Sequence, residues 1–391
     1  MRRQHKDPTN SNDQSDGRAL RDVPVWDRAV RLFHWLVVAC VTVAMTTGLF
    51  QSKAWFDIHV IAGSALTALI VFRLIWGFAG STYARFSSFA YAPATILREL
   101  RNLGGNAAQH NTYVGHNPPG AAMIFALLFV LALLAVTGVS VLGGVTKEGP
   151  LAPFASFAFG QSAQLVHRVL AYGLLALVAF HISGVVLESV RTRGGLIRAM
   201  VTGSKPVPDH AIRAPATLAR PALAGALTFL IIGPSALAIA HFAGLPPRGV
   251  PTATLTADYV KECGSCHSAH HPSVASRATW SAVMAGLDDH FGDNAALDQP
   301  VADEIRSYLM ANASEAWDTA AANVLRAANP QAPLRITETS AWKSIHADIA
   351  ASTFKRTGVG SKANCSNCHQ DAAHGRFAPR GISIPQEKTK Q

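Results

Sequence analysis

The feature that constrains this chain most is an apolar stretch, residues 164–189, that carries two histidines, His167 and His181. The stretch is long enough to cross the hydrocarbon layer of a membrane, about 30 Å thick, as a helix. Fourteen residues, at about 1.5 Å and 100° each, place the two rings about 21 Å apart on one face of that helix. An ionisable ring inside a membrane is costly without a partner, so both positions indicate a functional site. Iron is the partner that suits two neutral imidazoles spaced in this way.

Composition and hydropathy predict that much of the chain lies in a membrane. Hydrophobic residues make up 49% of the chain and charged residues 15%, a low charged fraction for a soluble protein. Five apolar segments are long enough to span a bilayer: residues 32–50, 58–78, 120–142, 164–187 and 222–242. The sequence therefore predicts an all-α membrane protein, with a four-helix transmembrane bundle and a fifth transmembrane helix, followed by a small, mainly helical domain.

Charge predicts how these segments are oriented. The net charge of +10 belongs to the part before residue 245, which holds 20 Lys and Arg against 10 Asp and Glu. With the N-terminus inside, the inner stretches hold 16 Lys and Arg, whereas the two short outer loops hold only Lys53 and Lys147. This asymmetry predicts a cytoplasmic N-terminus and a periplasmic C-terminal third in a bacterial inner membrane. The basic residues form no stripe interleaved with aromatic residues, so nucleic-acid binding is not indicated.

The expected domains follow from these segments. Residues 1–22 are polar and lack the apolar core of a signal peptide, so we expect a disordered cytoplasmic tail. Residues 23–210 form the predicted four-helix bundle, and residues 211–250 form the fifth transmembrane helix and a linker. Residues 251–391 form the predicted periplasmic domain.

Four histidines of the bundle pair by depth. His34 lies near the inner end of the first segment, and His59 lies near the outer end of the second segment, which runs back inward. The fourth segment runs in the same direction as the second, so its His167 is near the outer face and its His181 near the inner face. Depth therefore pairs His59 with His167 and His34 with His181, as ligands of two b-type haems. For any single ring the alternative is a hydrogen bond to a neighbouring helix, but four rings matched in depth favour haem.

The interval of fourteen residues recurs on the other two helices. Gly48 follows His34 by that interval and is small enough to let a macrocycle lie against the first helix. Arg73 follows His59 by the same interval, and we expect its guanidinium to pair with a haem propionate. Snorkelling of Arg73 to the inner headgroups is an alternative that the sequence leaves open.

Two Cys-x-x-Cys-His strings are the strongest local signals in the chain. They consist of Cys263, Cys266 and His267, and of Cys365, Cys368 and His369. The two thiols of such a string are spaced to add to the two vinyl groups of one haem, and the adjacent histidine is then an axial ligand. A zinc site made by the four cysteines would need a shorter interval between the strings, and a disulfide within each string would leave the histidine unexplained.

The sixth ligands of two c haems must come from other residues of the C-terminal third. The remaining histidines there are His270, His271, His290, His346 and His374. The first two and the last follow a proximal histidine too closely to reach over its haem. His290 and His346 each stand 23 residues from a proximal histidine, so we predict His290 for the first c haem and His346 for the second. Ligation by Met284 or Met310 stays open.

Assembled in this way, the first 210 residues resemble the bacterial cytochrome b561 family and the related b-type subunits of nickel–iron hydrogenases and formate dehydrogenases. The shared features are residues 25–35, 59–63, 72–80 and 83–86 and the pair of histidines on the fourth helix. In that family four histidines at these positions ligate two haems. The resemblance therefore implies the same role for the four histidines paired above by depth.

The C-terminal third is similar to the dihaem cytochrome c family. The residues that carry this likeness are 263–267, 280–292, 305–313, 342–346 and 364–369. The resemblance implies two covalently bound haems with two histidine ligands each, which supports His290 and His346. The fused domain departs from the simpler b561 pattern, so functions of stand-alone members, such as superoxide oxidation, do not carry over directly.

These features predict an electron-transfer protein of the respiratory chain. We expect electrons to move through two b haems and two c haems between the quinone pool, ubiquinone or menaquinone, and a periplasmic soluble cytochrome or dehydrogenase. Such a reaction would be of the quinol:cytochrome c oxidoreductase type, and no catalytic side chain is assigned. A haem enzyme acting on superoxide, oxygen or a nitrogen oxide is one alternative. A membrane anchor subunit of a periplasmic dehydrogenase or hydrogenase is the other.

Overall fold

The structure, a computed structural model, describes residues 20–50, 55–102, 113–192, 195–208, 211–252, 254–326 and 334–386. Its contacts divide the chain into two compact units. The first consists of Met1–Val37, Val71–Leu128 and Leu175–Leu227, and the second of Val38–Ile70, Phe129–Leu174 and Thr228–Gln391. His34 and His181 therefore belong to the first unit, whereas His59, His167 and the C-terminal third belong to the second.

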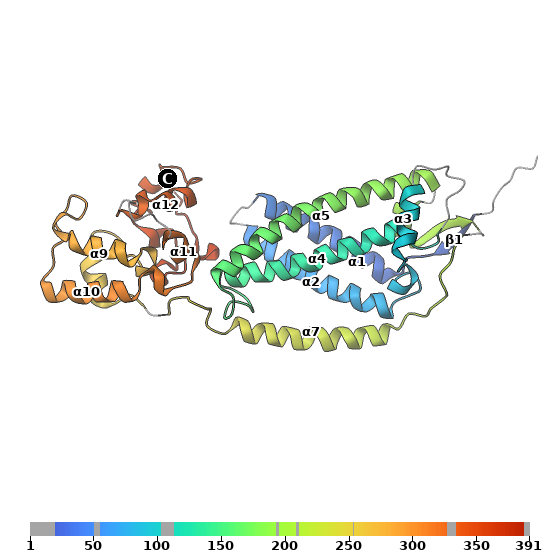
Figure 1. Cartoon of the computed structure of the whole chain (residues 1–391), viewed down its shortest axis with the longest axis horizontal. Helices are drawn as coiled ribbons and strands as arrows, with labels where there is room; N and C mark the ends of the chain where they lie inside the picture. The colour runs from blue at the N-terminus through green and yellow to red at the C-terminus, as the bar shows by residue number, and fades with distance from the viewer. Residues whose placement is uncertain are drawn as a thin grey trace, which may run out of the picture. The chain divides into compact units, whose positions relative to one another are not determined.

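Five helices are long and apolar enough to cross a membrane: α1 (Arg28–Phe50), α2 (Phe56–Ala79), α4 (Pro118–Gly144), α5 (Phe157–Thr192) and α7 (Pro221–Ala243). The first four run alongside one another as a bundle (Figure 1). Large apolar side chains on these helices point outward, among them Phe78 and Phe180, as expected for helices that face lipid. The predictions of five spans and of an all-α membrane fold are confirmed.

Asp27 organises the start of α1. Its Oδ1 atom accepts the backbone N–H of Val30 at 2.8 Å, a contact typical of an N-cap carboxylate. Its Oδ2 atom accepts the indole N–H of Trp76 at 3.0 Å and the hydroxyl of Ser81 at 2.6 Å. Trp76 lies in the last turn of α2 and Ser81 follows it, so one carboxylate joins the beginning of α1 to the end of α2.

The apolar core of the first unit surrounds this junction. Val25, Trp26, Ile75, Val114 and Ala199 are among its buried members. Ala199 lies in a short helix, α6 (Leu196–Thr202), and a second short helix, α3 (Pro93–Arg101), precedes α4. The connections between the spanning helices therefore contribute to the core as well as linking the helices.

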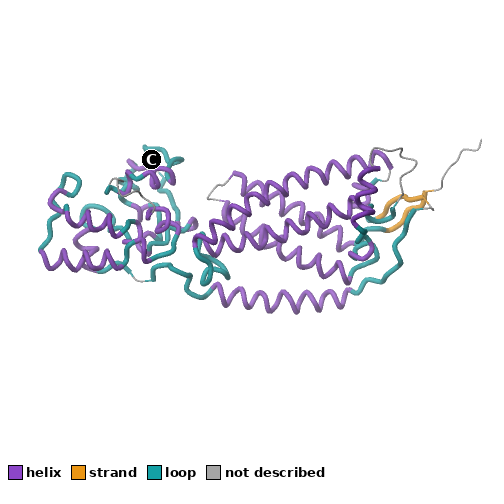
Figure 2. Tube along the Cα trace, in the orientation of Figure 1, coloured by secondary structure: helices purple, strands orange, loops and turns teal. Residues whose placement is uncertain are grey.

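Two short strands pair across a long interval of sequence. β1 (Leu20–Pro24) runs antiparallel to β2 (Ser204–Pro208), and this pair is the only sheet in the described part of the chain (Figure 2). The prediction of a disordered tail over residues 1–22 is therefore wrong from Leu20 onward, while residues 1–19 lie outside the described residues. Local patterns do not reveal such a pairing, because each strand is specified by its distant partner.

The C-terminal third is built from short helices: α8 (Ala257–Cys263), α9 (Arg277–Ala285), α10 (Gln299–Ala311), α11 (Ala320–Arg326) and α12 (Ser340–Ile345). Trp280, Met284, Ile305 and Leu309 form a buried apolar core among them, and Met310 packs against it. Both methionines are thus accounted for as packing residues. The prediction of a small, mainly helical domain is confirmed.

Replacing Asp27 by alanine should remove the N-cap contact and both hydrogen bonds that join α1 to α2. Loss of a cap costs about 1 kcal/mol and loss of hydrogen bonds to a charged group about 1.5–3 kcal/mol, so we expect the free energy of unfolding to fall by about 2–4 kcal/mol. A denaturing-detergent titration followed by circular dichroism measures this change. Asp22→Ala, at an exposed position of β1, is the control; equal stability of the two variants would contradict the role of Asp27.

Candidate functional site

His59 of α2 and His167 of α5 face each other in the second unit. Their ring centroids are 6.2 Å apart and their planes are inclined at 73°. Two imidazoles bound to opposite sides of one metal, with bonds of about 2 Å and about 1 Å from ring centre to nitrogen, have centroids about 6 Å apart. The structure therefore brings together the pair that the sequence predicted by depth, at a separation that would allow both imidazoles to bind one metal.

Hydrogen bonds to Nδ1 determine the tautomer of both rings. Nδ1 of His59 lies 3.0 Å from the carbonyl oxygen of Ala44 and 3.2 Å from Oγ1 of Thr47. Nδ1 of His167 lies 2.9 Å from Oγ1 of Thr137. Both threonine hydroxyls donate to carbonyls of their own helices, so each Oγ1 accepts the N–H of the histidine. The lone pair is then on Nε2 of each ring, where a metal ligand needs it.

Each of these rings also packs against a glycine. A Cβ atom at Gly48 would lie 3.2 Å from Cε1 of His59, and one at Gly138 would lie 3.4 Å from Cε1 of His167. Gly48 thus lies beside the ring of His59, which adds a contact that the sequence did not predict for it. The same dipeptide, Thr-Gly, on α1 and on α4 therefore positions both imidazoles. The threonines were missed from the sequence, although the repeated dipeptide beside each glycine was a usable signal.

His34 of α1 and His181 of α5 form the other predicted pair, in the first unit. They lie close enough to interact electrostatically. The ring of His34 stands edge-on to that of Trp35, with centroids 5.2 Å apart. Its Nδ1 atom is buried and, within the described residues, has no hydrogen-bond partner. Among the described residues His34 therefore lacks the hydroxyl contact that supports His59 and His167.

Arg73 lies in the same unit and is buried, with 4% of its surface exposed. Its Cζ atom stands 4.7 Å from the centre of the Phe86 ring, a cation–π contact. Its Nη1 atom is buried without a hydrogen-bond partner among the described residues. A side chain that snorkels to the headgroups would be exposed at its tip, so the structure favours a buried role for Arg73.

His267, of the first Cys-x-x-Cys-His string, faces His290. The ring centroids are 6.4 Å apart with planes inclined at 26°. Nδ1 of His267 lies 2.8 Å from the carbonyl oxygen of Ser268, which leaves Nε2 for a metal. Burial, and then the nearby His267 and Arg335, lowers the pKa of His290, so its ring is neutral and able to ligate.

His369, of the second string, faces His346. The centroids are 6.2 Å apart and the planes are inclined at 80°. Nδ1 of His346 lies 2.9 Å from the carbonyl oxygen of Trp342, and the indole of Trp342 stacks on the imidazole at 4.2 Å. Cys365 and Cys368 of the same string are free thiols, as are both cysteines of the first string.

The histidines next to these strings have other partners. His270 stacks on His267 with centroids 4.8 Å apart, too close for a metal between them; burial, and then His267, lowers the pKa of His270 to about 4. His271 is buried and its Nδ1 atom lies 2.8 Å from the hydroxyl of Ser273. Within the described residues, no group of three or more His, Cys, Asp or Glu side chains could hold a metal ion. The four-cysteine zinc alternative therefore has no support.

The two Cys-x-x-Cys-His strings lie against each other. The hydroxyls of Ser268 and Ser366 are 2.8 Å apart, and the N–H of Ser268 donates to Oδ1 of Asn364 at 3.3 Å. Nδ1 of His270 lies 3.7 Å from Sγ of Cys365. Groups attached to these two strings would consequently be near neighbours, an arrangement that the interval of about 100 residues between the strings does not reveal.

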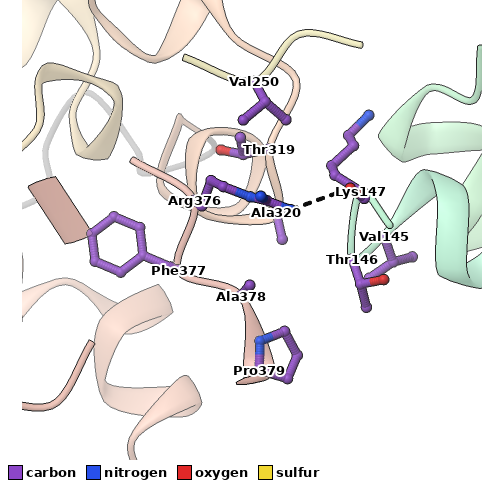
Figure 3. Close-up of a pocket in the computed structure, with 10 residues that line it drawn as sticks. All are labelled: Val145, Thr146, Lys147, Val250, Thr319, Ala320, Arg376, Phe377, Ala378 and Pro379. Carbon is purple, nitrogen blue, oxygen red and sulfur yellow. Dashed lines mark hydrogen bonds between the residues drawn. The ribbon is translucent and has the colours of Figure 1, made fainter. Parts of the chain in front are cut away.

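A cavity of about 100 Å³ lies elsewhere in the second unit (Figure 3). Lys147 lines it and donates to Asp318 at 2.8 Å and to the carbonyl oxygen of Ala155 at 3.0 Å. Partial burial would raise the pKa of Asp318, but hydrogen bonds from Lys147 and from the N–H of Phe157 lower it below its ordinary value. Arg376 donates to the carbonyl oxygen of Lys147 at 3.3 Å. The lining residues include no histidine or cysteine, so this cavity offers no metal ligand.

Comparison with known proteins separates the part of the chain that holds the helix-borne histidine pairs from the part that holds the two Cys-x-x-Cys-His strings. Residues 25–203 match the family model for prokaryotic cytochrome b561, and residues 259–377 match that for dihaem cytochrome c. A probable Ni/Fe-hydrogenase 1 B-type cytochrome subunit of Escherichia coli (strain K12) is 25% identical over 210 residues, which are 46% of this chain and 88% of that protein. A probable Ni/Fe-hydrogenase B-type cytochrome subunit of Bradyrhizobium diazoefficiens is 26% identical over 229 residues, 51% of this chain and 91% of that protein.

Solved structures are similar to the C-terminal third. A dihaem cytochrome c of Shewanella baltica OS155 is 35% identical, over 34% of this chain and 94% of that chain, with a TM-score of 0.27. A dihaem cytochrome c of Rhodobacter sphaeroides is 32% identical, over 34% of this chain and all of that chain, with a TM-score of 0.27.

Both families are haem proteins, which fits the three pairs of imidazoles held at 6.2–6.4 Å and the close approach of His34 to His181. The five spanning helices make this a multi-pass membrane protein. The chain is therefore a membrane protein of electron transfer that is similar to prokaryotic cytochrome b561 over residues 25–203 and to dihaem cytochrome c over residues 259–377.

Proposed function

We propose that this protein transfers electrons across a bacterial inner membrane, between the quinone pool and a periplasmic redox partner, through two b haems and two c haems. The observation that carries the proposal is a recurrent geometry: imidazole centroids 6.2–6.4 Å apart occur once between spanning helices and once at each Cys-x-x-Cys-His string. A haem iron bound by two imidazoles in addition to the four nitrogens of the macrocycle would have no open coordination position. Such sites suit electron transfer better than the binding of a small molecule.

Each haem site in this proposal is formed by a defined set of residues. His59 with His167, and His34 with His181, ligate the two non-covalent b haems. Cys263 and Cys266 bind the first c haem, with His267 and His290 as ligands. Cys365 and Cys368 bind the second, with His369 and His346. Bound haem supplies one-electron chemistry at iron, and the surrounding chain sets its orientation and potential.

The protein's own hydrogen bonds prepare the b site at His59 and His167. Thr137 accepts the Nδ1–H of His167, and Thr47 shares the Nδ1–H of His59 with the carbonyl oxygen of Ala44, so both rings present Nε2 without a rotation on binding. A hydrogen-bonded imidazole is also the more basic ligand, which stabilises the oxidised iron. These threonines are therefore positioning residues that tune the potential.

Orientation in the membrane rests on charge. The excess of Lys and Arg in the N-terminal tail and in the connections after the second and fourth spans supports a cytoplasmic N-terminus. With five spans, the C-terminal third is then periplasmic. The relatives match about half of this chain. The fused cytochrome c region adds an electron relay on the periplasmic side, and its tether to the bundle gives it a high effective concentration there.

A second candidate function follows from the names of the relatives. They are b-type cytochrome subunits of Ni/Fe-hydrogenases, and this chain could serve in the same way as the membrane subunit of a periplasmic hydrogenase or dehydrogenase. The fused dihaem region favours a soluble partner that docks transiently, because that region supplies an electron relay within the same chain. Stable co-purification with a dehydrogenase subunit would support the second function instead.

Purified protein should contain two b haems and two c haems per chain, all six-coordinate and low-spin. Pyridine haemochrome spectra measure the stoichiometry, and low-temperature optical spectra measure the spin state. Carbon monoxide should leave the spectrum of the reduced protein unchanged, because both axial positions of every haem are filled. A five-coordinate haem that binds carbon monoxide would contradict the proposal and favour a small-molecule enzyme.

His181→Ala should remove one b haem, retain the other b haem and both c haems, and stop reduction by quinol. Optical spectra and the rate of reduction by a quinol analogue are the measurements. His241→Ala, at an exposed position near the end of α7, is the matched control and should behave as wild type. Loss of both b haems, or of neither, would refute the assigned pairing.

Thr47→Val and Thr137→Val should each raise the reduction potential of the b haem held by His59 and His167. Without the hydroxyl of Thr137 the imidazole of His167 is a weaker donor to iron, so we expect a threefold to tenfold shift toward the reduced form, about 30–60 mV for one electron. Thr47→Val should give a smaller shift in the same direction, because the carbonyl oxygen of Ala44 still accepts from His59. A spectroscopic redox titration measures the shift. Thr42→Val removes an exposed hydroxyl of α1 that bonds only within its helix and should leave the potential unchanged. Equal potentials in all three variants would exclude this tuning.

A further inference from the structure

A cluster of buried basic side chains lies in the first unit, outside the histidine pairs. Arg73 and Lys205 are 4% and 8% exposed, and both interact electrostatically with His116, which lies just before α4. Lys205 donates to the carbonyl oxygen of Tyr113 at 3.0 Å. By contrast Nη1 of Arg73 and Nδ1 of His116 are buried and, in the described ranges, have no hydrogen-bond partner.

Aromatic rings hold the two unpartnered groups in place. The ring of His116 lies between those of Trp26 and Phe89, with centroids 4.4 Å and 4.7 Å away. The guanidinium of Arg73 lies over Phe86, whose ring centre is 5.9 Å from that of Phe89. The two groups therefore lie against one continuous aromatic cluster, which limits their freedom to reorient toward protein acceptors.

Two carboxylates act electrostatically on this cluster, Glu188 on Lys205 and Asp27 on Arg73. Asp27 interacts with Arg73 only at a distance, its oxygens being bonded to Val30, Trp76 and Ser81. Among the described residues Arg73 forms no ion pair. Burial, and then the positive charges of Arg73 and Lys205, lowers the pKa of His116 to about 3. A buried guanidinium without an anion in contact is strongly unfavourable. The surroundings of Arg73 therefore favour the binding of a negatively charged group.

We infer that Arg73 and His116 together bind a carboxylate, a propionate of the b haem that His34 and His181 hold. The inference rests on the proposed function and adds a residue, His116, that no pattern in the sequence singled out. A guanidinium binds a carboxylate in a charge-assisted contact, and a neutral imidazole donates one further hydrogen bond from Nδ1. The electrostatic interaction of His116 with His181 as well as with Arg73 places the three groups in one neighbourhood.

The test uses the full-length holoprotein with its haem carboxylates labelled with ¹³C from labelled 5-aminolevulinate. Redox-induced infrared difference spectra report on the labelled carboxylates, and a spectroscopic redox titration reports on each b haem. Arg73→Leu and His116→Leu should both shift a labelled carboxylate band. Each should lower the potential of the haem that His181→Ala removes. We expect about a tenfold shift toward the oxidised form for Arg73→Leu, or about 59 mV for one electron, and a smaller shift for His116→Leu.

Conservative variants and a surface control guard against indirect effects. Arg73→Lys should change the reduction potential of that haem only slightly, because it keeps the positive charge. His116→Gln should also change it only slightly, because it keeps a hydrogen-bond donor. Arg98→Leu removes an exposed arginine of α3 in the same unit and should change neither readout. If Arg73→Leu does not fold, His116→Leu still decides the question, since an unchanged labelled band in His116→Leu would overturn the inference.

The outcomes also separate this inference from the function on which it rests. If His181→Ala removes no b haem, the haem assignment of the proposed function fails, and the inference fails with it. If His181→Ala removes one b haem but the labelled bands of the Arg73 and His116 variants match those of wild type, only the inference fails. A change in potential without a change in the labelled bands would mean that a different oxyanion, such as free phosphate or a lipid headgroup, occupies the site, and would also overturn it.

Discussion

The structure depends on one interaction above all, the hydrogen bond that occupies Nδ1 of a histidine and turns Nε2 toward a second imidazole. At His59 and His167 the acceptors include threonine hydroxyls that already donate to their own helices, together with the carbonyl oxygen of Ala44 at His59. At His267 and His346 the Nδ1 atom lies beside a backbone carbonyl oxygen close in sequence to the histidine itself, that of Ser268 and that of Trp342 respectively. In each case the ring is oriented before any metal binds, which lowers the entropy that binding must overcome.

This preorganisation explains why one geometry appears in two unrelated settings. In the bundle, helices that share no local sequence with the cytochrome c region bring rings to 6.2 Å. In the C-terminal third, short helices and turns reach 6.2 Å and 6.4 Å. The shared separation would suit one metal bound by both imidazoles, and it does not depend on a shared fold. Membrane helices achieve it through glycines that allow close approach, whereas the small domain achieves it through loops next to the two Cys-x-x-Cys-His strings.

The two histidine pairs of the bundle differ in their surroundings. His59 and His167 have polar acceptors on Nδ1, which increase electron donation to a metal. His34 has none among the described residues, and the buried basic groups Arg73 and Lys205 lie in its unit. A positive field favours the reduced form of a metal centre, and a strongly donating ligand favours the oxidised form. Such an asymmetry would give the two b sites different potentials and hence a preferred direction between them.

The sequence by itself determined the five spans and both Cys-x-x-Cys-His strings, because each depends on a local period or a local spacing, and it predicted the pairing of four histidines from their depths in the membrane. It also led to His290 and His346 by their intervals from the proximal histidines. Tertiary structure alone decided the rest. Thr47, Thr137 and His116 acquire their roles from residues that are distant in the sequence. The pairing of Leu20–Pro24 with Ser204–Pro208 joins two distant segments. The contact of Ser268 with Ser366 joins the two Cys-x-x-Cys-His strings. A periodic pattern reports which face of a helix is apolar, but the identity of the group opposite that face is a long-range property that only packing establishes.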